Sequence, residues 1–271
     1  MIFLMACTQA DTTTREHGEI SLLTYNIHGL PPQITGDDTT VRIRDIAPML
    51  DSFDIVALQE DWMDDNHQIL RESNDHLVVD RFDTPLDDDK VYGSGLSYFG
   101  AYPITSVSHV YYHSCHGFVS SGSDCFASKG VQQLTLQIEE DVSLHLLNTH
   151  LEAGGASEDD DARTEQIFHI LDLLAEIPSE PVVVMGDFNL RPSDPVEDEL
   201  LHLFREEGGL RQTCMEASCP EPDHIDQIFV RSGTEIQLNV QSWVRDESFV
   251  DSQGVDLSDH PAIVSHLTWE R

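Results

Sequence analysis

Short apolar runs recur along the sequence, and their length and spacing constrain the fold more than any other feature. Each run is rich in Val, Ile, Leu and aromatic residues, a composition typical of β-strands. The runs occupy residues 20–25, 54–58, 96–99, 107–112, 131–138, 143–148, 181–185, 225–230, 235–244 and 262–267. They predict a protein in which strands outnumber helices.

Helical patterns lie between some of these runs, at residues 41–50, 66–72, 162–177 and 196–205. Strands that occur both as hairpin neighbours and in alternation with helices predict a mixed α/β protein, a four-layer sandwich of two face-to-face β-sheets flanked by helices. The sequence has no internal repeat and no long Pro/Gly linker. We therefore expect a single domain over residues 20–271, preceded by a polar tail within residues 1–19.

The charge balance limits the partners of this chain. Fifty Asp and Glu residues against fourteen Lys and Arg residues give a formal net charge of −36, and the only lysines are Lys90 and Lys129. Clustered Lys and Arg supply most of the non-specific affinity for nucleic acid, so an acidic surface disfavours such a substrate. The composition favours a neutral or zwitterionic substrate and the capture of divalent cations.

The N-terminal residues resemble the end of a bacterial lipoprotein signal. Residues 1–7 read MIFLMAC, with Leu three places and Ala one place before Cys7, and a Thr-rich tail follows. The basic region and the longer apolar run of such a signal are missing. Two interpretations stay open: a lipid-anchored N-terminus whose signal begins upstream, or an accidental apolar start.

The remaining cysteines form two close pairs in loops, Cys115 with Cys125 and Cys214 with Cys219. This spacing fits two short-loop disulfides in an extracytoplasmic protein, secreted, periplasmic or lipid-anchored at the cell surface. The alternative is four unpaired thiols. Zinc is disfavoured because neither pair has the two-residue spacing of a metal knuckle.

Polar groups follow or precede several predicted strands, where a strand meets solvent. Taken singly, each has an ordinary explanation as a turn former, a cap or a solvated strand end. Taken in order, the segments form a pattern: TYNIHGL around Asn26, IVALQE ending at Glu60, LNTHL around His150, VMGDFN with Asp187 and Asn189, DHIDQIF with Asp226, and SDHP with Asp259 and His260.

This pattern resembles the endonuclease/exonuclease/phosphatase family, which includes DNase I-like nucleases, inositol phosphatases and neutral sphingomyelinases. The resemblance covers roughly residues 20–268 and implies the DNase I-like fold. The branch it resembles most is the sphingomyelinase-type phospholipase C, through residues 123–131 around Lys129 and through THLEA followed by Arg163 and Gln166.

Two segments depart from that branch. A GAYPI sequence stands where Ser-Lys or Ser-Arg usually precedes Tyr-Pro-Ile. Residues 245–258, where haemolytic members carry an aromatic hairpin, are acidic, with Phe249 as their only aromatic. We therefore do not expect this protein to lyse membranes.

The resemblance, together with the needs of phosphodiester hydrolysis, implies a metal site. Carboxylate and amide oxygens suit Mg²⁺, so Glu60 is the expected direct ligand with Asn26 beside it, and Mn²⁺ or another divalent cation would also suit. Asp259 is expected to bind metal or to brace the site. Lys129 and His28 are candidate phosphate contacts.

The same resemblance implies roles in proton transfer. Asp187 and Asn189 would position the attacking water and the phosphate, and His150 would donate a hydrogen bond to a phosphate oxygen. His260 would be the general base, with Asp226 holding its other ring nitrogen. Whether His260 or Asp187 removes the proton from water stays open.

Three functions compete at this stage. The first is a Mg²⁺-dependent phosphodiesterase of the sphingomyelinase C type, acting on a phospholipid or a small phosphodiester. The second is a nuclease of the same fold, which the charge of −36 disfavours. The third is a catalytically silent surface lipoprotein, which is disfavoured because every expected polar site position is filled. No protein partner is predicted.

Overall fold

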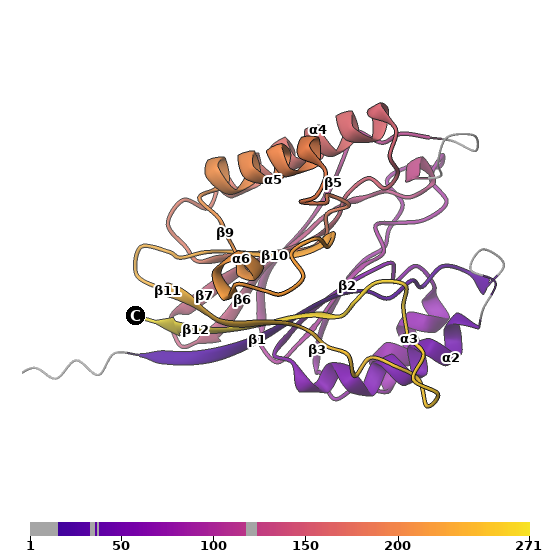
Figure 1. The fold of residues 1–271 in the computed structure, drawn as a ribbon. Coiled ribbons are helices and arrows are strands. Elements are labelled where there is room, and N and C mark those ends of the chain that lie inside the picture. Colours follow the sequence, from indigo (N-terminus) through magenta and orange to yellow (C-terminus); the bar gives the residue numbers. More distant parts are fainter. Residues whose placement is uncertain (1–15, 33–35, 37, 118–123) are drawn as a thin grey trace, which may run out of the picture.

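The computed structural model describes residues 16–32, 36, 38–117 and 124–271. Two β-sheets pack face to face at its centre, and helices cover the outer face of each (Figure 1). The predicted lipoprotein-like segment at residues 1–7 lies outside the described residues. None of the helices in the described part of the chain is both long and apolar enough to span a membrane.

The first sheet has the strand order β11-β12-β1-β2-β4-β3. Its strands are β1 (His17–Asn26), β2 (Ile55–Gln59), β3 (Val78–Phe82), β4 (Leu96–Gly100), β11 (Gln237–Arg245) and β12 (Ile263–Glu270). Strand β1 lies at the centre, parallel to β2 and antiparallel to β12. The first and last described strands of the chain are therefore hydrogen-bonded neighbours.

The second sheet has the order β5-β6-β7-β8-β10-β9. Its strands are β5 (Ile104–Tyr111), β6 (Gly130–Glu139), β7 (Val142–His150), β8 (Val182–Asp187), β9 (Arg211–Gln212) and β10 (Asp226–Arg231). The pair β7 and β8 is parallel, whereas the other pairs are antiparallel. This sheet is built from one continuous stretch of the sequence.

Helices connect and cover the two sheets. They are α2 (Thr39–Ile46), η1 (Ala47–Ser52), α3 (Asp64–Glu72), η2 (Asp124–Phe126), α4 (Ser157–Ala175), α5 (Pro195–Gly208) and α6 (Thr213–Ala217). In Figure 1, α4 and α5 lie above the second sheet, and α2 and α3 lie below the first. Helix α5 begins at an Asp194 cap, whose carboxylate accepts hydrogen bonds from the Val196 and Glu197 amides.

Three apolar clusters fill the spaces between these layers. One lies between the two sheets and includes Leu22, Leu146 and Ile228. A second joins α2, η1 and α3 to the first sheet, and a third joins α4 and α5 to the second sheet. The predicted four-layer α/β sandwich is confirmed, because each interface between layers has its own buried core.

The structure corrects several predicted elements. Strands β3 and β9 and helix α6 were not predicted. The single helix predicted over residues 41–50 is divided into α2 and η1, because Pro48 lies in the first turn of η1 and cannot donate a backbone hydrogen bond. Helix α4 begins at Ser157, before the predicted 162, since Glu158, Asp159 and Asp160 occupy its first turn, where negative charge is favourable.

Both predicted disulfides are confirmed. Cys115 pairs with Cys125 across Cα atoms 5.4 Å apart. Cys214 pairs with Cys219 at a Cα separation of 4.9 Å. These four cysteines are therefore not free thiols.

Candidate active site

The topology brings the polar strand ends to one edge of the sandwich. Asn26, His150 and Asp187 end β1, β7 and β8, and Glu60 follows β2 directly. Asp226 instead begins β10, and the segment containing His260 precedes β12. They reach the same edge because β10 runs antiparallel to β8 and β12 runs antiparallel to β1, so that Asp226 is directly opposite Asp187.

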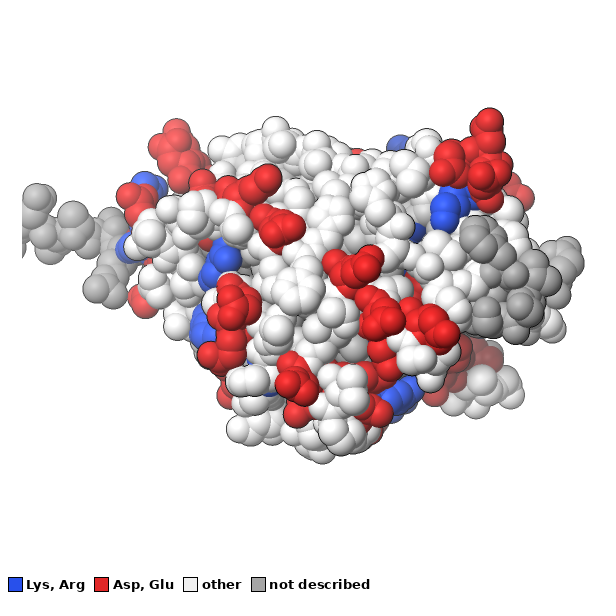
Figure 2. Space-filling view, turned by 90° about the horizontal axis from the view of Figure 1, so that it is seen from above, with Lys and Arg blue, Asp and Glu red and all other residues white. Residues whose placement is uncertain are grey.

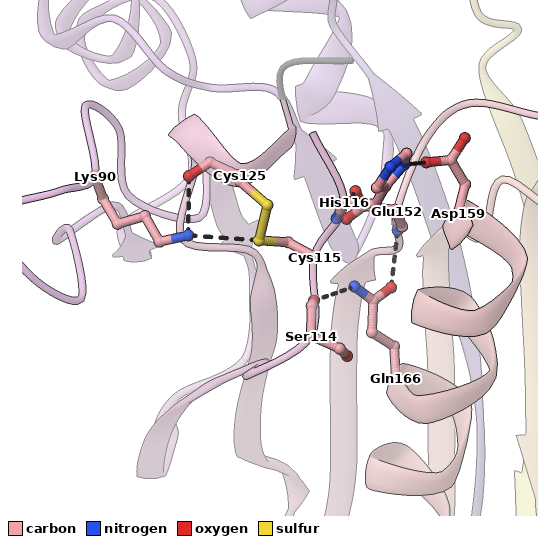
Figure 3. The surroundings of a disulfide bond; sticks show 8 residues. All are labelled: Lys90, Ser114, Cys115, His116, Cys125, Glu152, Asp159 and Gln166. Carbon is pink, nitrogen blue, oxygen red and sulfur yellow. Dashed lines mark hydrogen bonds and ion pairs between the residues drawn. A yellow bond between two sulfur atoms is a disulfide. The ribbon is translucent and has the colours of Figure 1, made fainter. Parts of the chain in front are cut away.

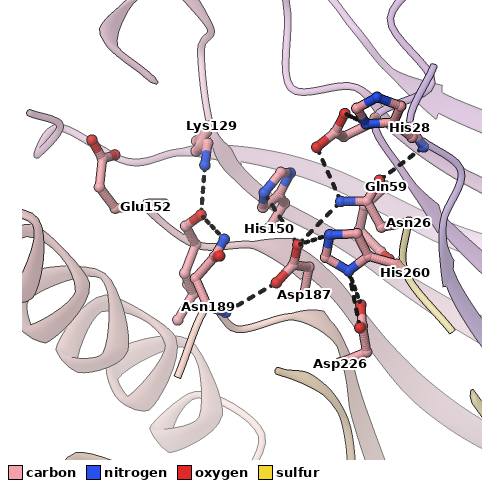
Figure 4. A network of polar contacts seen from close by, with 12 residues as sticks. Asn26, His28, Gln59, Lys129, His150, Glu152, Asp187, Asn189, Asp226 and His260 are labelled. Carbon is pink, nitrogen blue, oxygen red and sulfur yellow. Dashed lines mark hydrogen bonds and ion pairs between the residues drawn. The ribbon is translucent and has the colours of Figure 1, made fainter. Parts of the chain in front are cut away.

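Asn26 connects the two sheets. Its Nδ2 donates to Glu60 Oε1 at 3.0 Å and to Asp187 Oδ2 at 3.1 Å, as Figure 4 shows in part. Its Oδ1 accepts a hydrogen bond from the His28 backbone N–H at 3.0 Å. The fully buried Asn26 side chain thus fixes two carboxylates that come from strands in different sheets.

Glu60 is held in a conformation that directs its carboxylate into the site. Its φ angle is +62°, and the chain at Gly29 passes so close that a Cβ there would lie 2.3 Å from the Glu60 carbonyl oxygen. Burial raises the pKa of the Glu60 carboxyl. Its Oε2 is buried and accepts no hydrogen bond from any described residue, and His28 Nδ1 lies 3.8 Å away.

Asp187 lies at the centre of the site. Its Oδ1 accepts a hydrogen bond from the Asn189 backbone N–H at 3.0 Å. Its Oδ2 lies 3.5 Å from His150 Nε2 and 3.7 Å from His260 Nε2. Burial and the nearby charge of Asp226 raise the pKa of Asp187 to about 6, against the opposing effect of His260. The carboxylate is therefore largely ionised at neutral pH.

The backbone beside Asp187 requires glycine. Gly186 has a φ of +148°, and a Cβ there would lie 1.9 Å from the carbonyl oxygen of Thr149. This close approach of β8 to β7 pairs His150 with Asp187 in the parallel register. Any side chain at residue 186 would push the two functional groups apart.

His260 and Asp226 form a closely hydrogen-bonded pair. His260 Nδ1 lies 3.0 Å from Asp226 Oδ2 and 3.1 Å from Oδ1, and the Asp226 side chain is buried. Burial alone would lower the pKa of His260. The Asp226 hydrogen bond and the charges of Asp226, Asp187 and Asp259 outweigh burial and raise that pKa to about 10. The ring is therefore a cation at neutral pH, with Nε2 facing Asp187.

Lys129, Asn189 and His150 form the opposite side of the site. Lys129 Nζ and Asn189 Nδ2 both donate to the Leu151 carbonyl oxygen, at 2.6 and 3.2 Å. Asn189 has a φ of +49°, which turns the chain sharply after β8. Burial, then the charges of Lys129 and His260, hold the pKa of His150 well below its usual range. These three residues place hydrogen-bond donors beside Asp187.

Asp259 lies at the exposed rim of the site, in contact with His28. Its side chain is 60% exposed, and its Oδ1 is 3.3 Å from His28 Nδ1. Because Glu60 Oε2 lies 3.8 Å from the same nitrogen, both carboxylates approach one atom of the His28 ring. The predicted role of Asp259 as a metal ligand stays a prediction, and its observed contact is with His28.

A buried amide network below the site was not singled out in the sequence. Gln59 Nε2 donates to Asn148 Oδ1 at 2.8 Å, and Asn148 Nδ2 donates to Gln132 Oε1 at 3.1 Å. The available signal is spacing: Gln59 directly precedes Glu60, Asn148 lies two residues before His150, and Gln132 lies three residues after Lys129. The network ties β2 to β6 and β7 across the two sheets.

The Cys115–Cys125 disulfide lies beside the site (Figure 3). Lys90 Nζ donates to the Cys125 carbonyl oxygen at 2.9 Å, and the His116 backbone N–H donates to Glu152 Oε1 at 2.7 Å. Glu152 follows β7 two residues after His150. The backbone next to Cys115 is therefore attached to the chain that follows the strand end carrying His150.

The residues Arg163 and Gln166 of α4 hold the same strand end. Arg163 Nη1 donates to the carbonyl oxygens of Glu152 and Gly154, at 3.1 and 2.9 Å. Gln166 Oε1 accepts a hydrogen bond from the Glu152 backbone N–H at 2.8 Å. Their role in this structure is to position the loop that follows β7.

Comparison with known families and curated proteins agrees with this arrangement. The sequence profile described as the endonuclease/exonuclease/phosphatase family matches residues 23–260. A sphingomyelinase of Mycobacterium tuberculosis is 25% identical over 278 residues, covering 95% of this chain and 54% of its own length. Human sphingomyelin phosphodiesterase 2 is 24% identical over 250 residues, covering 80% and 57%. The chain thus spans about half the length of these relatives.

An inositol phosphosphingolipids phospholipase C of Schizosaccharomyces pombe is 30% identical over 184 residues, covering 64% of this chain and 42% of its own length. Solved structures share the fold at low identity. Sphingomyelinase C from Streptomyces griseocarneus superposes with a TM-score of 0.67 at 17% identity, over 92% of this chain and 99% of its own. A beta toxin variant from Staphylococcus aureus with bound magnesium ions gives 0.66 at 16%, over 92% and 99%.

Proposed function

Because the chain belongs to the endonuclease/exonuclease/phosphatase family, we propose that it is a metal-dependent phosphoric diester hydrolase of the sphingomyelinase C type. It would release a phosphorylated head group from a phospholipid or a related small phosphodiester. The observation that carries this proposal is the convergence of Glu60, Asp187 and His260 around the buried amide of Asn26. The candidate metal ligand Glu60, the ionised carboxylate of Asp187 and the cationic ring of His260 then lie close together.

The donor set beside Asn26 fits a hard divalent cation such as Mg²⁺. Glu60 Oε2 is buried and accepts no hydrogen bond from the described residues, and the Asp187 carboxylate offers further oxygen nearby. Asn26 turns its Nδ2 toward both carboxylates and thereby fixes their positions. Glu60 would hold the cation, with Asn26 beside it and Asp259 as a further candidate. When bound, such a cation neutralises charge that develops on the phosphate oxygens. The relative with bound magnesium ions supports this choice.

Asp187 is the better candidate for accepting the proton of the attacking water. Its pKa of about 6 leaves it ionised at neutral pH, whereas the pKa of His260 near 10 leaves that ring protonated. The cationic His260, held by Asp226, would then stabilise the negative charge of the transition state. The sequence leaves open whether His260 or Asp187 removes the proton from water, and our proposal assigns this role to Asp187.

The phosphate would be bound by the donors on the other side of Asp187. His150 has Nε2 directed toward Asp187, while its Nδ1 is buried and has no hydrogen-bond partner among the described residues. Lys129 and Asn189 meet at the Leu151 carbonyl oxygen within the same group. Fixed donors of this kind cost no reorganisation during the reaction.

The surface favours a small or zwitterionic substrate over nucleic acid. Acidic side chains are spread over the face shown in Figure 2, with few basic ones between them, and the formal net charge is −36. Such a field repels a long polyanion at low salt. Phe249, the one aromatic of residues 245–258, is buried against Tyr25 at a ring distance of 4.9 Å. That contact supports the expectation that the segment does not insert into membranes.

An extracytoplasmic location is part of the proposal. It is supported by the two disulfides, which are stable mainly in oxidising compartments. Anchorage through Cys7 stays a prediction, since that residue lies outside the described part of the chain.

A substrate panel tests the function. Purified protein with Mg²⁺ is offered sphingomyelin in mixed micelles, bis-p-nitrophenyl phosphate, plasmid DNA and inositol polyphosphate, with Glu60→Gln as a matched control. We expect cleavage of the lipid and of the small diester that EDTA and the Glu60 substitution both abolish. Faster cleavage of plasmid DNA would replace the proposal by a nuclease function. Absence of turnover on the whole panel would favour a non-catalytic binding role.

A further inference from the structure

Arg81, on strand β3, lies among three carboxylates next to the candidate metal ligand. Its Nη1 donates to Asp64 Oδ1 at 2.6 Å, and its Nη2 lies 2.8 Å from Asp83 Oδ2. The same Nη2 donates to the Asp61 backbone carbonyl oxygen at 2.9 Å, and Arg81 Nε lies 3.8 Å from Asp61 Oδ2. Asp61 directly follows Glu60 in the sequence. One guanidinium therefore reaches both the main chain and the side chain of the residue next to Glu60.

The backbone at Glu60 needs support from its surroundings. Its φ angle of +62° is one that residues with a side chain adopt rarely and keep only where neighbouring groups hold it. The Asp61 N–H donates to the Gly95 carbonyl oxygen at 2.9 Å, and the Asp61 carbonyl oxygen accepts from Arg81. Both hydrogen-bonding groups of the Asp61 main chain are thus engaged. They fix the direction in which the Glu60 side chain leaves the end of β2.

The Asp61 side chain is fully buried and anchors the same turn. Its Oδ2 accepts a hydrogen bond from Ser97 Oγ at 2.6 Å, and His67 Nδ1 lies 2.5 Å from that oxygen. A buried carboxylate is costly unless positive charge lies beside it. Arg81, with a side chain only 16% exposed, supplies a permanent charge, whereas an imidazole is charged only when protonated. Burial raises the pKa of Asp83 to about 6, and the charge of Arg81 opposes that rise.

We propose that Arg81 is a positioning residue for the metal site, which holds the segment after β2 so that the Glu60 carboxylate stays directed toward Asn26. The inference rests on the proposed function, because Glu60 is the candidate metal ligand. Arg81 would act through Asp61 and would touch neither the cation nor the substrate. Groups that orient a metal ligand in this way typically change metal affinity about 10- to 100-fold when they are replaced.

The sign of the change in metal affinity separates positioning from simple electrostatics. Arg81→Gln removes a positive charge near the site, and charge alone would make a divalent cation bind more tightly. Loss of the hydrogen bond to the Asp61 carbonyl oxygen instead frees the segment next to Glu60 and should weaken binding. We expect the dissociation constant for Mn²⁺ to rise about tenfold in Arg81→Gln. Arg81→Lys keeps the charge but not the planar fork of donors, and should raise the constant about threefold.

Electron paramagnetic resonance of free Mn²⁺ measures this constant without any turnover. The formal charge of −36 predicts weak binding of further Mn²⁺ ions elsewhere, so a titration of Glu60→Gln is subtracted to isolate the Glu60-dependent site. Arg211→Gln is the matched control. Arg211 Nη1 donates to both carboxylate oxygens of Glu216, at 2.7 and 2.9 Å, and Nη2 donates to the Leu238 carbonyl oxygen at 2.6 Å. This variant loses bonds of the same kind on β9 and should bind Mn²⁺ as the wild type does.

Two results would overturn the proposal directly. One is an Mn²⁺ affinity that is unchanged or higher in Arg81→Gln. The other is equal weakening in Arg81→Gln and Arg211→Gln, which would mark general destabilisation. Circular dichroism melts show whether each variant is folded at the temperature of the titration. If Arg81→Gln is not folded, Arg81→Lys decides, and wild-type affinity in that variant would overturn the proposal.

The same titrations distinguish failure of this inference from failure of the proposed function. If Arg81→Gln weakens the Glu60-dependent site while the wild type cleaves no substrate of the panel, the positioning role stands without the reaction. If the wild type cleaves a diester with Mg²⁺ and Arg81→Gln has wild-type affinity, the reaction stands without the positioning role. If Glu60→Gln binds Mn²⁺ as the wild type does, the metal role of Glu60 and this inference both fail.

Discussion

Replacement of Asp226 by Asn should change the pH dependence of catalysis more than its maximum. The carboxylate of Asp226 holds His260 Nδ1 at 3.0 Å and is the main cause of the raised pKa of that ring. Asparagine keeps the size of the side chain but removes its charge. Without the Asp226 charge, less electrostatic stabilisation of the His260 cation opposes the lowering of its pKa by burial. We therefore expect that pKa to fall from about 10 to near or below its ordinary value of about 6.5.

The size of the effect follows from the fraction of cationic His260. In the wild type nearly all of the ring is protonated at pH 8, whereas at a pKa of about 6.5 only about 3% would be. If the cation stabilises the transition state, kcat/KM of Asp226→Asn falls about 30-fold at pH 8 but less than about twofold at pH 6. This loss is smaller than the ~10²- to 10⁴-fold expected for His260→Ala.

The free energy of unfolding of the wild type should also depend on pH, through the same titration of His260. A histidine whose folded pKa is raised contributes stability that is fully present below its unfolded pKa near 6.5 and is lost as the pH rises through about 10. The full contribution of such a buried pair is on the order of 3–5 kcal/mol. The difference in unfolding free energy between the wild type and Asp226→Asn should therefore shrink between pH 6 and pH 10.

Rate profiles at saturating Mg²⁺ and urea denaturation at both pH values are the measurements. NMR titration of the His260 ring in the metal-free protein reports its pKa directly. A wild-type ring that titrates near pH 6.5, or a loss of kcat/KM that is the same at pH 6 and pH 8, would refute the cationic role. Activity that rises through the pKa of His260 would make this residue the general base.

Four further outcomes are expected. EDTA should abolish turnover and Mg²⁺ or Mn²⁺ restore it in the wild type but not in Glu60→Gln, and undiminished activity after chelation and dialysis would remove the metal from the mechanism. His260→Ala and Asp187→Asn should each reduce kcat at least ~10²-fold with unchanged circular dichroism melts, whereas losses that only follow unfolding would mark both residues as structural. Intact mass should show two disulfides before reduction, and four alkylated thiols in protein from an oxidising compartment would contradict the pairing. Plasmid DNA should be cleaved more slowly than small diesters at low ionic strength, and the reverse order would restore the nuclease alternative.

Sequence patterns predicted the long strands because their apolar runs are local signals, and they missed elements that depend on distant contacts. Strand β3 contains Asp80 and Arg81, which interrupt its apolar pattern. These charges are compensated by partners elsewhere in the sequence: Arg81 Nη1 lies 2.6 Å from Asp64 Oδ1, and His109 Nε2 lies 2.7 Å from Asp80 Oδ2. Strand β9 has only two residues, too few for any periodicity, and exists through its pairing with β10.

The candidate site was predicted from its ordered motifs, but its charge states required the folded geometry. Asp226 and His260 are 34 positions apart in sequence, and their spacing gives no indication of which one controls the other. Asp259 is adjacent to His260, yet it faces His28 because the segment before β12 turns its side chain outward. Trp62, Tyr92 and Phe126 line one cavity beside the site but come from separate segments without a shared pattern, so their convergence appears only in the structure.

The pairing of β1 with β12 has a consequence for how the chain acquires its fold. His17 is opposite Glu270, and the Arg271 N–H donates to the Glu16 carbonyl oxygen at 2.9 Å. During synthesis, the edge of β1 that pairs with β12 has no partner until residues 263–270 have been made. Every strand of the second sheet, in contrast, comes from one continuous stretch of the sequence. Such long-range pairing slows folding and prolongs the exposure of an apolar edge. The second sheet can therefore assemble first, as the template against which β1 and β12 pair.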